Sequence, residues 1–295
     1  MAAIPPELLA ARERFLDLVG NLRPDLHRYC SRLVGSAIDG EDVVQEALAK
    51  AAEAFATAGT IVQPEAWMFR IAHNTALDAL RRRKRQGLAR SDLAMADVAD
   101  PSAAADSRVA AAASLASFLR LPAAQRSSVV LIDVLGHSLA ETAEILSVSL
   151  AVVKAALNRA RTRLRALAET PETPAPRLVA DERERLRAYA DRFNARDFDA
   201  LRALLAEDVR LDLANRRRLV GSKDVSRYFT RYSDISGWRA TLCRAEGRLA
   251  LMISDPAAEA TNYVVVLDWA NGRVSAIRDY RFAPYVMESL PLSPL

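Results

Sequence analysis

The proline-rich segment Glu169–Pro176 constrains the fold of this chain more than any other feature, because it holds three prolines within its last six residues. Proline lacks a backbone N–H and fixes φ, so the segment cannot continue a helix and should be extended and fairly stiff. A second interruption is the stretch 87–113, which is rich in Ala, Ser and Asp and has little apolar periodicity. We therefore expect the chain to fold in separate pieces.

Three pieces remain in the 295 residues, and we expect domains at 8–86, 114–168 and 178–290, joined by linkers at 87–113 and 169–177. Hydrophobic residues make up 51% of the chain, so each piece can bury a core. The first two pieces have helical periodicity, and the third mixes helix and strand patterns. The expected fold class is multidomain, with two all-α domains followed by an α+β domain.

In the first piece, apolar residues recur at helical spacing between Asp39 and Phe55. Asp39 is positioned to cap this helix, and Gly59-Thr60 to end it. Pro64 can start the next helix at its first turn, and that helix runs to the basic block Arg81–Arg85.

The second piece has the pattern of a helix-turn-helix. Gly136 should stop its first helix, Ser138 and Glu141 fit a capping box, and Ser149 can cap the last helix. The expected bounds are Leu121–Leu135, Ser138–Leu146 and Leu150–Leu167. A short helix, a tight turn and a longer basic helix are typical of a recognition helix placed in a major groove.

The third piece alternates between helix and strand patterns. The expected helices are Glu182–Asn194, Phe198–Ala206 and Lys223–Tyr232, and the expected strands are Val209–Leu213, Trp238–Glu246, Arg248–Ser254, Thr261–Trp269 and Val274–Phe282. Asn271-Gly272 is a strong hairpin signal between the last two strands.

The net charge of +4 is modest, but the basic residues are grouped. One group is Arg81–Arg85, and the other lies within 150–168, where no acidic residue occurs. Each group alone would be typical of a solvated helix face. Two separate groups favour two contacts with a polyanion.

Several classes of protein are disfavoured by composition. The N-terminus lacks a signal-peptide pattern and no apolar run could cross a bilayer, so we expect a cytoplasmic protein without membrane contact. Cys30 and Cys243 lie far apart, imply no disulfide framework and are expected in cores. His27 beside Cys30, with His73 and His137 unpaired, gives no four-ligand zinc set, and we expect neither a metal nor a cofactor.

The sequence from Pro64-Glu-Ala-Trp-Met-Phe-Arg-Ile-Ala-His-Asn74 to Arg85 resembles region 2 of extracytoplasmic-function sigma factors of the sigma-70 family. The preceding Asp39-Gly-Glu-Asp-Val-Val-Gln-Glu46 resembles that family's polymerase-binding helix. Leu121 to Leu167 resembles region 4, with Val153-Lys154 and Asn158-Arg-Ala-Arg161 in the family's places. This resemblance covers a little over half the chain. It implies a sigma factor that binds core RNA polymerase and directs promoter recognition and transcription initiation.

The resemblance also implies roles for particular residues. The β′ coiled coil of polymerase would contact Asp42, Gln45 and Glu46, region 4 would meet the β flap, and the loop Ala56–Gln63 would capture an unstacked base of the −10 element. The residues implied for −10 DNA are Arg70, His73, Asn74, Arg81, Arg82, Arg83, Lys84 and Arg85. A lone histidine on a helix is more often a packing or surface residue. Asn74 is the better candidate of the adjacent pair, because it occupies the family's Ile-Ala-His/Arg-Asn position.

For the −35 element the candidates are Lys154, Asn158, Arg159, Arg161 and Arg163. Here the chain departs from the family, whose recognition helix begins Gly-Thr-Val-Lys-Ser-Arg. This chain has Ala151-Val-Val-Lys-Ala-Ala156 instead, and so lacks a hydroxyl and an arginine near the DNA. We expect weaker or different −35 contacts.

Residues 178–290 resemble the SnoaL-like, nuclear-transport-factor-like cone. The resemblance rests on element order and on Tyr189, Phe193, Asn194, Phe198 and the helix start within Gly221–Phe229. A cavity that could hold an unknown small-molecule ligand would use Asp212, Tyr228, Trp238, Trp269 and Asp279. The domain contains no histidine, and we expect it to regulate the sigma factor in place of a separate anti-sigma protein rather than to be an enzyme.

Two alternatives stay open. One is a helix-turn-helix repressor or activator that acts without polymerase docking, although the residues before Gly87 argue against it. The other is a SnoaL-like enzyme fused to a DNA-binding module.

Overall fold

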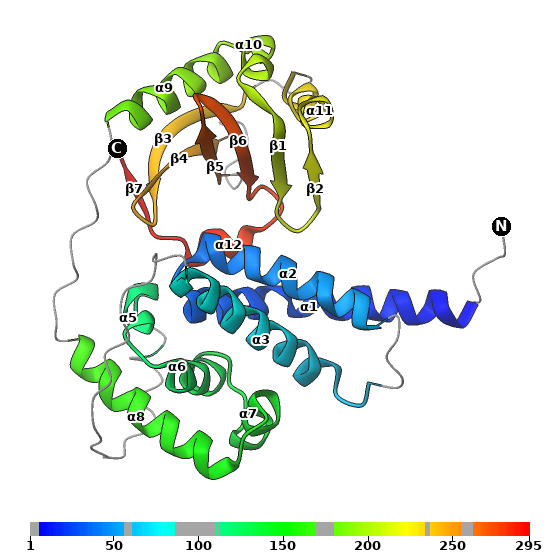
Figure 1. Ribbon diagram of the computed structural model, residues 1–295, viewed down its shortest axis with the longest axis vertical. Coiled ribbons are helices and arrows are strands. Elements are labelled where there is room, and N and C mark those ends of the chain that lie inside the picture. Colours follow the sequence, from blue (N-terminus) through cyan, green and yellow to red (C-terminus); the bar gives the residue numbers. More distant parts are fainter. Residues whose placement is uncertain are drawn as a thin grey trace. The chain divides into compact units, whose positions relative to one another are not determined.

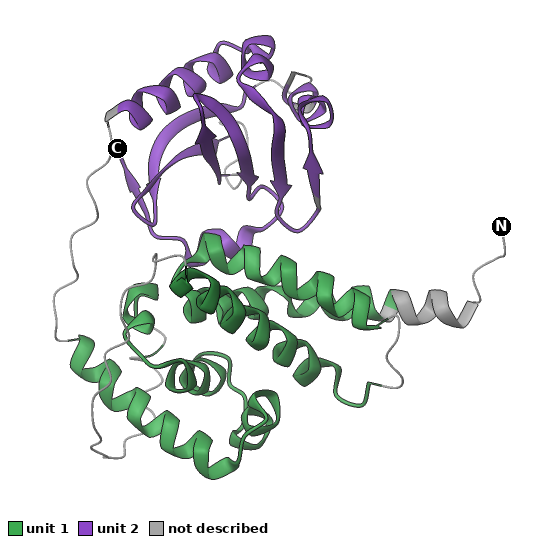
Figure 2. Ribbon diagram, viewed as in Figure 1, with its two compact units in different colours: residues 1–172 green, residues 173–295 purple. Residues whose placement is uncertain are grey.

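The computed structural model describes residues 6–55, 61–85, 110, 113–168, 180–233, 237–254 and 262–295. The chain forms two compact units, residues 1–172 and 173–295 (Figure 2). The expected linker 169–177 and nearly all of the linker 87–113 lie outside the described residues, as does most of the loop Ala56–Gln63.

The first unit is helical throughout its described part (Figure 1). Its helices are α1 (Pro6–Val34), α2 (Ala37–Phe55), α3 (Pro64–Arg85), α5 (Leu115–Leu119), α6 (Ala123–Val129), α7 (Leu139–Leu146) and α8 (Leu150–Ala168), and a π-helical turn, Val130–Val134, continues α6. The all-α character expected of both pieces is confirmed.

The start of α2 differs from the expected one. Ser36, rather than Asp39, supplies the side-chain cap, because its Oγ accepts a hydrogen bond of 3.0 Å from the backbone N–H of Asp39. Asp39 already lies in the first helical turn and forms an ion pair of 2.5 Å with Arg83 of α3. The expected cap residue therefore joins two helices.

The helix-turn-helix has the expected local chemistry. Ser138 Oγ accepts from the backbone N–H of Glu141 at 3.2 Å, and the Glu141 carboxylate accepts from the backbone N–H of Ser138 at 2.7 Å, so the capping box is confirmed. Ser147 adopts the left-handed conformation with φ of 54° and ends α7. Ser149 Oγ accepts from the N–H of Val152 at 3.4 Å and caps α8.

The helix expected at Leu121–Leu135 is not a regular α-helix. It begins at Ala123, and its last turn is π-helical, with the N–H of Leu135 donating to the carbonyl of Val130 at 3.0 Å. Gly136, with φ of 80°, follows the end as expected.

The two helical pieces share one hydrophobic core. Tyr29, Phe69, Phe118 and Leu131 are fully buried in a single cluster that draws on α1, α3, α5 and the π-helical turn. Helices α1 and α3 of the first piece contact α6 and α7 of the second. The pieces expected as separate modules thus pack together as one unit.

The second unit is a mixed sheet with helices (Figure 1). Its strands are β1 (Leu205–Leu213), β2 (Arg217–Val220), β3 (Arg239–Ala245), β4 (Arg248–Ser254), β5 (Tyr263–Ala270), β6 (Arg273–Asp279) and β7 (Leu292–Pro294), in the order β2-β1-β6-β5-β4-β3-β7. Among the strands of the described residues, β1 and β6 alone pair in parallel. The helices are α9 (Ala180–Asn194), α10 (Phe198–Ala203), α11 (Ser222–Ser233) and α12 (Pro284–Ser289).

The core of this unit lies between the helices and the sheet. Leu186 and Phe193 of α9 and Val225 and Phe229 of α11 pack in one cluster with the strands, among them Leu211 of β1. The expected α+β cone is confirmed, and Asn271-Gly272 forms the expected turn with positive φ at both residues. β1 begins four residues earlier than expected, because Leu205 pairs with Val274 of β6.

Helices α1 and α2 cross so closely that the crossing requires Gly40. A Cβ added there would lie 2.7 Å from Ser31 Cα and 2.8 Å from Ser31 N. We expect Gly40→Ala to destabilise the helical unit by about 1–3 kcal/mol, because backbone atoms must shift. Urea unfolding and amide hydrogen exchange of α1 and α2 would measure this.

The matched control is Gly20→Ala in α1, where an added Cβ meets nothing within 4 Å. That change should stabilise the helix by about 0.5–1 kcal/mol. Equal effects of the two substitutions would contradict the close crossing.

Candidate nucleic-acid interface

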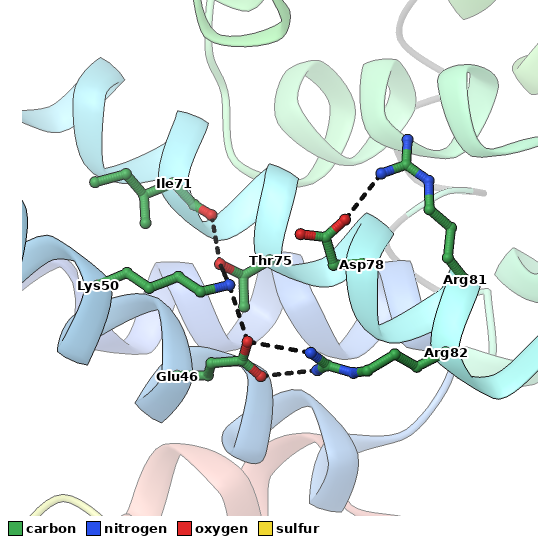
Figure 3. A network of polar contacts seen from close by, with 7 residues as sticks. All are labelled: Glu46, Lys50, Ile71, Thr75, Asp78, Arg81 and Arg82. Carbon is green, nitrogen blue, oxygen red and sulfur yellow. Dashed lines mark hydrogen bonds and ion pairs between the residues drawn. The ribbon is translucent and has the colours of Figure 1, made fainter.

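Glu46 of α2 does not project freely from the helix. Glu46 forms a bidentate ion pair with Arg82 of α3, with oxygen–nitrogen distances of 2.8 and 3.3 Å, and a second pair with Lys50 at 2.9 Å (Figure 3). The Arg82 guanidinium lowers the pKa of the Glu46 carboxyl. Gln45 and Asp42 are half-buried, and the Gln45 amide donates to Glu41 at 3.5 Å. The expected polymerase-binding residues thus lie on one helix, and one of them is tied to the basic block.

The basic block at the end of α3 is exposed except for Arg83, which is half-buried. Arg81 pairs with Asp78 at 2.8 Å on its own helix (Figure 3). Arg83 pairs with Asp39 and also donates to the carbonyl of Val34 at 3.2 Å. Basic side chains at a helix C-terminus complement the helix dipole, so the block also stabilises α3.

Arg70, His73 and Asn74 occupy three different environments. Arg70 donates to the carbonyl of Glu144 in α7 at 2.9 Å, and Asn74 is exposed. His73 is half-buried, and its Nδ1 lies 2.8 Å from the hydroxyl of Tyr29 in α1. Burial lowers the pKa of His73 to about 4, so the ring is neutral at pH 7. This placement fits a packing role for His73 and leaves Asn74 as the accessible member of the pair.

Arg126 of α6 is a structural residue that the sequence reasoning missed. Its guanidinium is buried and donates to the carbonyl of Leu33 in α1, to that of Leu121 at 2.8 Å and to that of Leu119 at 3.3 Å. The last turn of α1 carries the negative end of the helix dipole, which favours a cation there. Arg126 therefore links the two helical pieces. An arginine between Gln125 and two serines in a helix carries no sequence signal for such a role.

On α8, Lys154 and Arg159 are exposed, and Asn158 and Arg163 are half-buried. Arg161 forms a bidentate ion pair with Asp133 of the π-helical turn, at 2.9 and 2.6 Å, and the Asp133 side chain is only 2% exposed. Breaking such a buried pair leaves an uncompensated charge. Arg161 therefore holds α8 against the π-helical turn, whereas Lys154 and Arg159 are exposed to solvent.

In the second unit, a buried carboxylate gathers tyrosine hydroxyls. Asp279 accepts hydrogen bonds from Tyr228 at 2.6 Å, from Tyr232 at 3.1 Å and from the backbone N–H of Arg281 at 2.8 Å. The hydroxyls of Tyr232 and Tyr263 lie 2.6 Å apart. Burial raises the pKa of Asp279, and the hydrogen bonds oppose part of that rise.

The structure brings only some of the expected cavity residues together. Trp238 packs edge-on against Tyr263, with ring centroids 5.6 Å apart, and so joins the cluster around Asp279. Asp212 instead pairs with Arg218 at 2.5 Å, and Trp269 lies beneath Arg185 of α9. Sequence reasoning missed Tyr232, although its spacing of four residues from Tyr228 places both on one helix face.

Cys30 and Cys243 are free and buried, as expected. His27 is also buried, and its Nε2 lies 3.0 Å from the carbonyl of Ala37. Within the described residues, no group of three or more His, Cys, Asp and Glu side chains could hold a metal ion. No helix in the described part of the chain is long and apolar enough to span a membrane.

Three family profiles match the chain in succession. Sigma-70 region 2 matches residues 18–86, Sigma-70 region 4 matches residues 115–164, and the SnoaL-like domain matches residues 186–277. The first runs from within α1 to the end of α3, the second covers α5–α7 and most of α8, and the third covers most of the second unit.

Individual relatives agree with the first two matches. The extracytoplasmic-function (ECF) RNA polymerase sigma factor SigM of Mycobacterium tuberculosis is 34% identical over 163 residues, which are 54% of this chain and 81% of SigM. SigG of the same species is 31% identical over 208 residues, which are 61% of this chain and 55% of SigG. The crystal structure of the M. tuberculosis ECF sigma factor SigJ is 21% identical with a TM-score of 0.35, over 90% of this chain and 95% of SigJ.

The buried carboxyl of Asp279 predicts a pH dependence of stability. Its folded pKa is raised above the ordinary 3.8, so between these two pKa values the folded state holds a proton that the unfolded state has lost. In this window the free energy of unfolding falls as pH rises, by up to about 1.4 kcal/mol per pH unit. Asp279→Asn should remove this component.

Urea unfolding at a series of pH values, followed by tryptophan fluorescence and by hydrogen exchange of β6, would compare the variant with the native chain. Asp268→Asn is the control, because Asp268 is half-exposed and paired with Arg278. An unchanged pH slope in Asp279→Asn would contradict the raised pKa.

Proposed function

This chain belongs to the family of ECF RNA polymerase sigma factors, and on that premise we propose that it binds core RNA polymerase and directs transcription initiation at its own promoters. The observation that carries the proposal is the ordered match to Sigma-70 regions 2 and 4, with 34% identity to SigM over most of that relative. A sigma factor acts on polymerase in the cytoplasm, and we propose that location for this chain.

We infer that α2 is the polymerase-binding element, through Asp42, Gln45 and Glu46. Their acceptor groups suit the basic side chains of a coiled coil such as that of the β′ subunit. Glu46 would then exchange Arg82 for a polymerase cation. That exchange is feasible because the pair is partly exposed, at 35% for Glu46 and 46% for Arg82, and exposed pairs contribute only about 0–1 kcal/mol.

For the −10 element we propose Asn74 as the residue nearest to base recognition, with the exposed cations of α3 on phosphates. Arg70 and His73 contact α7, α1 and α6 in this structure. Arg70 would take part only after the two helical pieces separate, and His73 would in addition have to leave Tyr29 of its own piece. We therefore infer that the compact helical unit is a resting arrangement, and that promoter binding requires it to open.

For the −35 element we propose α8, with Lys154 and Arg159 on DNA and Arg163 and Asn158 as further candidates. A helix without acidic residues between Leu150 and Ala168 suits a polyanionic partner. We assign Arg161 to positioning α8 through Asp133. The β flap of polymerase is the proposed protein partner of this region.

We propose that the second unit regulates the sigma factor and is not an enzyme. The support is its SnoaL-like match on a chain whose relatives are sigma factors. An unknown small molecule is the proposed effector. A ligand shifts an equilibrium between closed and open helical units only through a difference in its affinity for the two states.

Transcription by core polymerase tests the main proposal. Run-off assays on a genomic promoter library should yield discrete transcripts that depend on this chain. Asp42→Ala should reduce affinity for core polymerase by about tenfold, or about 1.4 kcal/mol. The control is Glu53→Ala on the same helix, which is exposed and lies about two turns beyond Glu46, the last of the proposed docking residues. Regulated DNA binding without any dependence on core polymerase would favour a helix-turn-helix repressor or activator instead.

Deletion of residues 171–295 tests the regulatory proposal. If the second unit restrains or assists the helical unit, the shortened chain should change promoter-dependent transcription by severalfold at equal occupancy of core polymerase. Unchanged run-off yields on every promoter would remove the regulatory role and leave sigma activity standing.

A further inference from the structure

The recognition end of α8 presents an apolar surface where a DNA-reading helix usually presents polar groups. Val148 is 40% exposed, Leu150 47% and Val152 49%. These are three of the nine large hydrophobic residues that are exposed within the described residues, and they fall within five consecutive positions. We call Val148, Leu150, Ala151, Val152 and Ala155 the apolar reading face.

This face is not the packing side of the helix. Val153, Ala156, Leu157 and Ala160 form the buried stripe of α8, whereas Ala151, Val152 and Ala155 are exposed. The reading face therefore points away from the core of the helical unit.

Hydrogen-bonding groups are scarce at this end of the helix. The five side chains of the apolar reading face carry no donor or acceptor, and the hydroxyl of Ser149 already accepts from the N–H of Val152 as the helix cap. Direct reading of bases by bidentate hydrogen bonds needs amide, guanidinium or carboxylate groups. The first two turns of α8 cannot supply them from this face.

The surroundings of the face indicate its partner. Lys154 and Arg159 are exposed on the same helix; Lys154 lies one turn from Leu150 and Ala151, and Arg159 lies one turn from Ala155. An apolar strip bordered by cations fits the major groove of a DNA duplex, because phosphates flank that groove. The apolar group that the major groove offers is the 5-methyl of thymine.

We propose that the apolar reading face recognises thymine methyl groups in the −35 element, so that this promoter box is selected by apolar contact rather than by hydrogen bonds to bases. The inference rests on the proposed sigma function and specifies its DNA target. Lys154 and Arg159 hold the flanking phosphates and set the depth of the helix in the groove. Val152 and Leu150 determine specificity.

The test replaces thymine by 2′-deoxyuridine, which pairs identically but lacks the methyl. Holoenzyme made from core polymerase and the full chain first selects duplexes from a library that is randomised in the upstream box. Selected boxes should contain thymine. Uracil at a contacted position should weaken binding about fourfold, the factor equal to about 0.8 kcal/mol for one buried methyl.

Variants separate specificity from general affinity. Val152→Ser should bind the thymine and uracil duplexes equally, whereas Lys154→Ala should weaken both alike and reduce the log–log salt slope by about 0.9. Val220→Ser, which removes an exposed valine from the other unit, is the matched control and should change neither. Circular dichroism checks that each variant is folded, and the uracil substitution in DNA needs no variant at all.

Equal affinity of the native holoenzyme for thymine and uracil boxes would overturn the proposal, as would selected boxes without thymine. If Val152→Ser instead alters self-association and leaves DNA binding unchanged, the face is a protein-docking surface and the proposal fails. Failure of the sigma function is a different result, namely the absence of core-dependent transcription from any template.

Discussion

The guanidinium of Arg126 is buried at the C-terminal end of α1, and the compact form of the helical unit depends on this arrangement. Three backbone carbonyls, from Leu33, Leu119 and Leu121, receive its N–H groups. The positive charge lies at the negative end of the α1 dipole, which offsets part of the cost of burial. The shared core around Tyr29 and Phe69 forms in the same region, so separating the two pieces would expose both a cation and apolar surface.

This arrangement explains why so many candidate DNA-binding groups have partners within the chain. Arg70 bonds to the backbone of α7, His73 to Tyr29, and Arg82 to Glu46. The cations that we propose for phosphate contacts are thus satisfied by carboxylates and carbonyls of the chain itself. These internal pairs lower the free-energy cost of gathering like charges, and under the proposed function promoter DNA would have to compete with them.

Local patterns in the sequence predicted the structure correctly where it is determined by residues close together in the chain. The capping box at Ser138 and Glu141 and the hairpin turn at Asn271-Gly272 depend on contacts within a few positions, and both are confirmed. Features set by distant contacts were not predictable. β2 is a charged edge strand whose pairing is fixed by β1. The hydrogen-bonded cluster of Asp279 and tyrosines forms because Asp279 lies in an interior strand of the sheet, within reach of Tyr228 and Tyr232 of α11. Of the candidate site, the helices were predictable from sequence, whereas the partner of each charge, such as Asp133 for Arg161, was not.

The π-helical turn Val130–Val134 affects how residue roles can be transferred between this chain and its relatives. A π turn holds one residue more than the α turn that it replaces. In a relative whose helix is regular, the residues after this turn would be shifted by one position relative to those of this chain. An alignment without a gap would then match Asp133 to the wrong neighbour. Deleting one residue here would restore regular helical geometry and rotate the carboxylate away from Arg161. The orientation of α8 is thus linked to the extra residue that the π-helical turn holds.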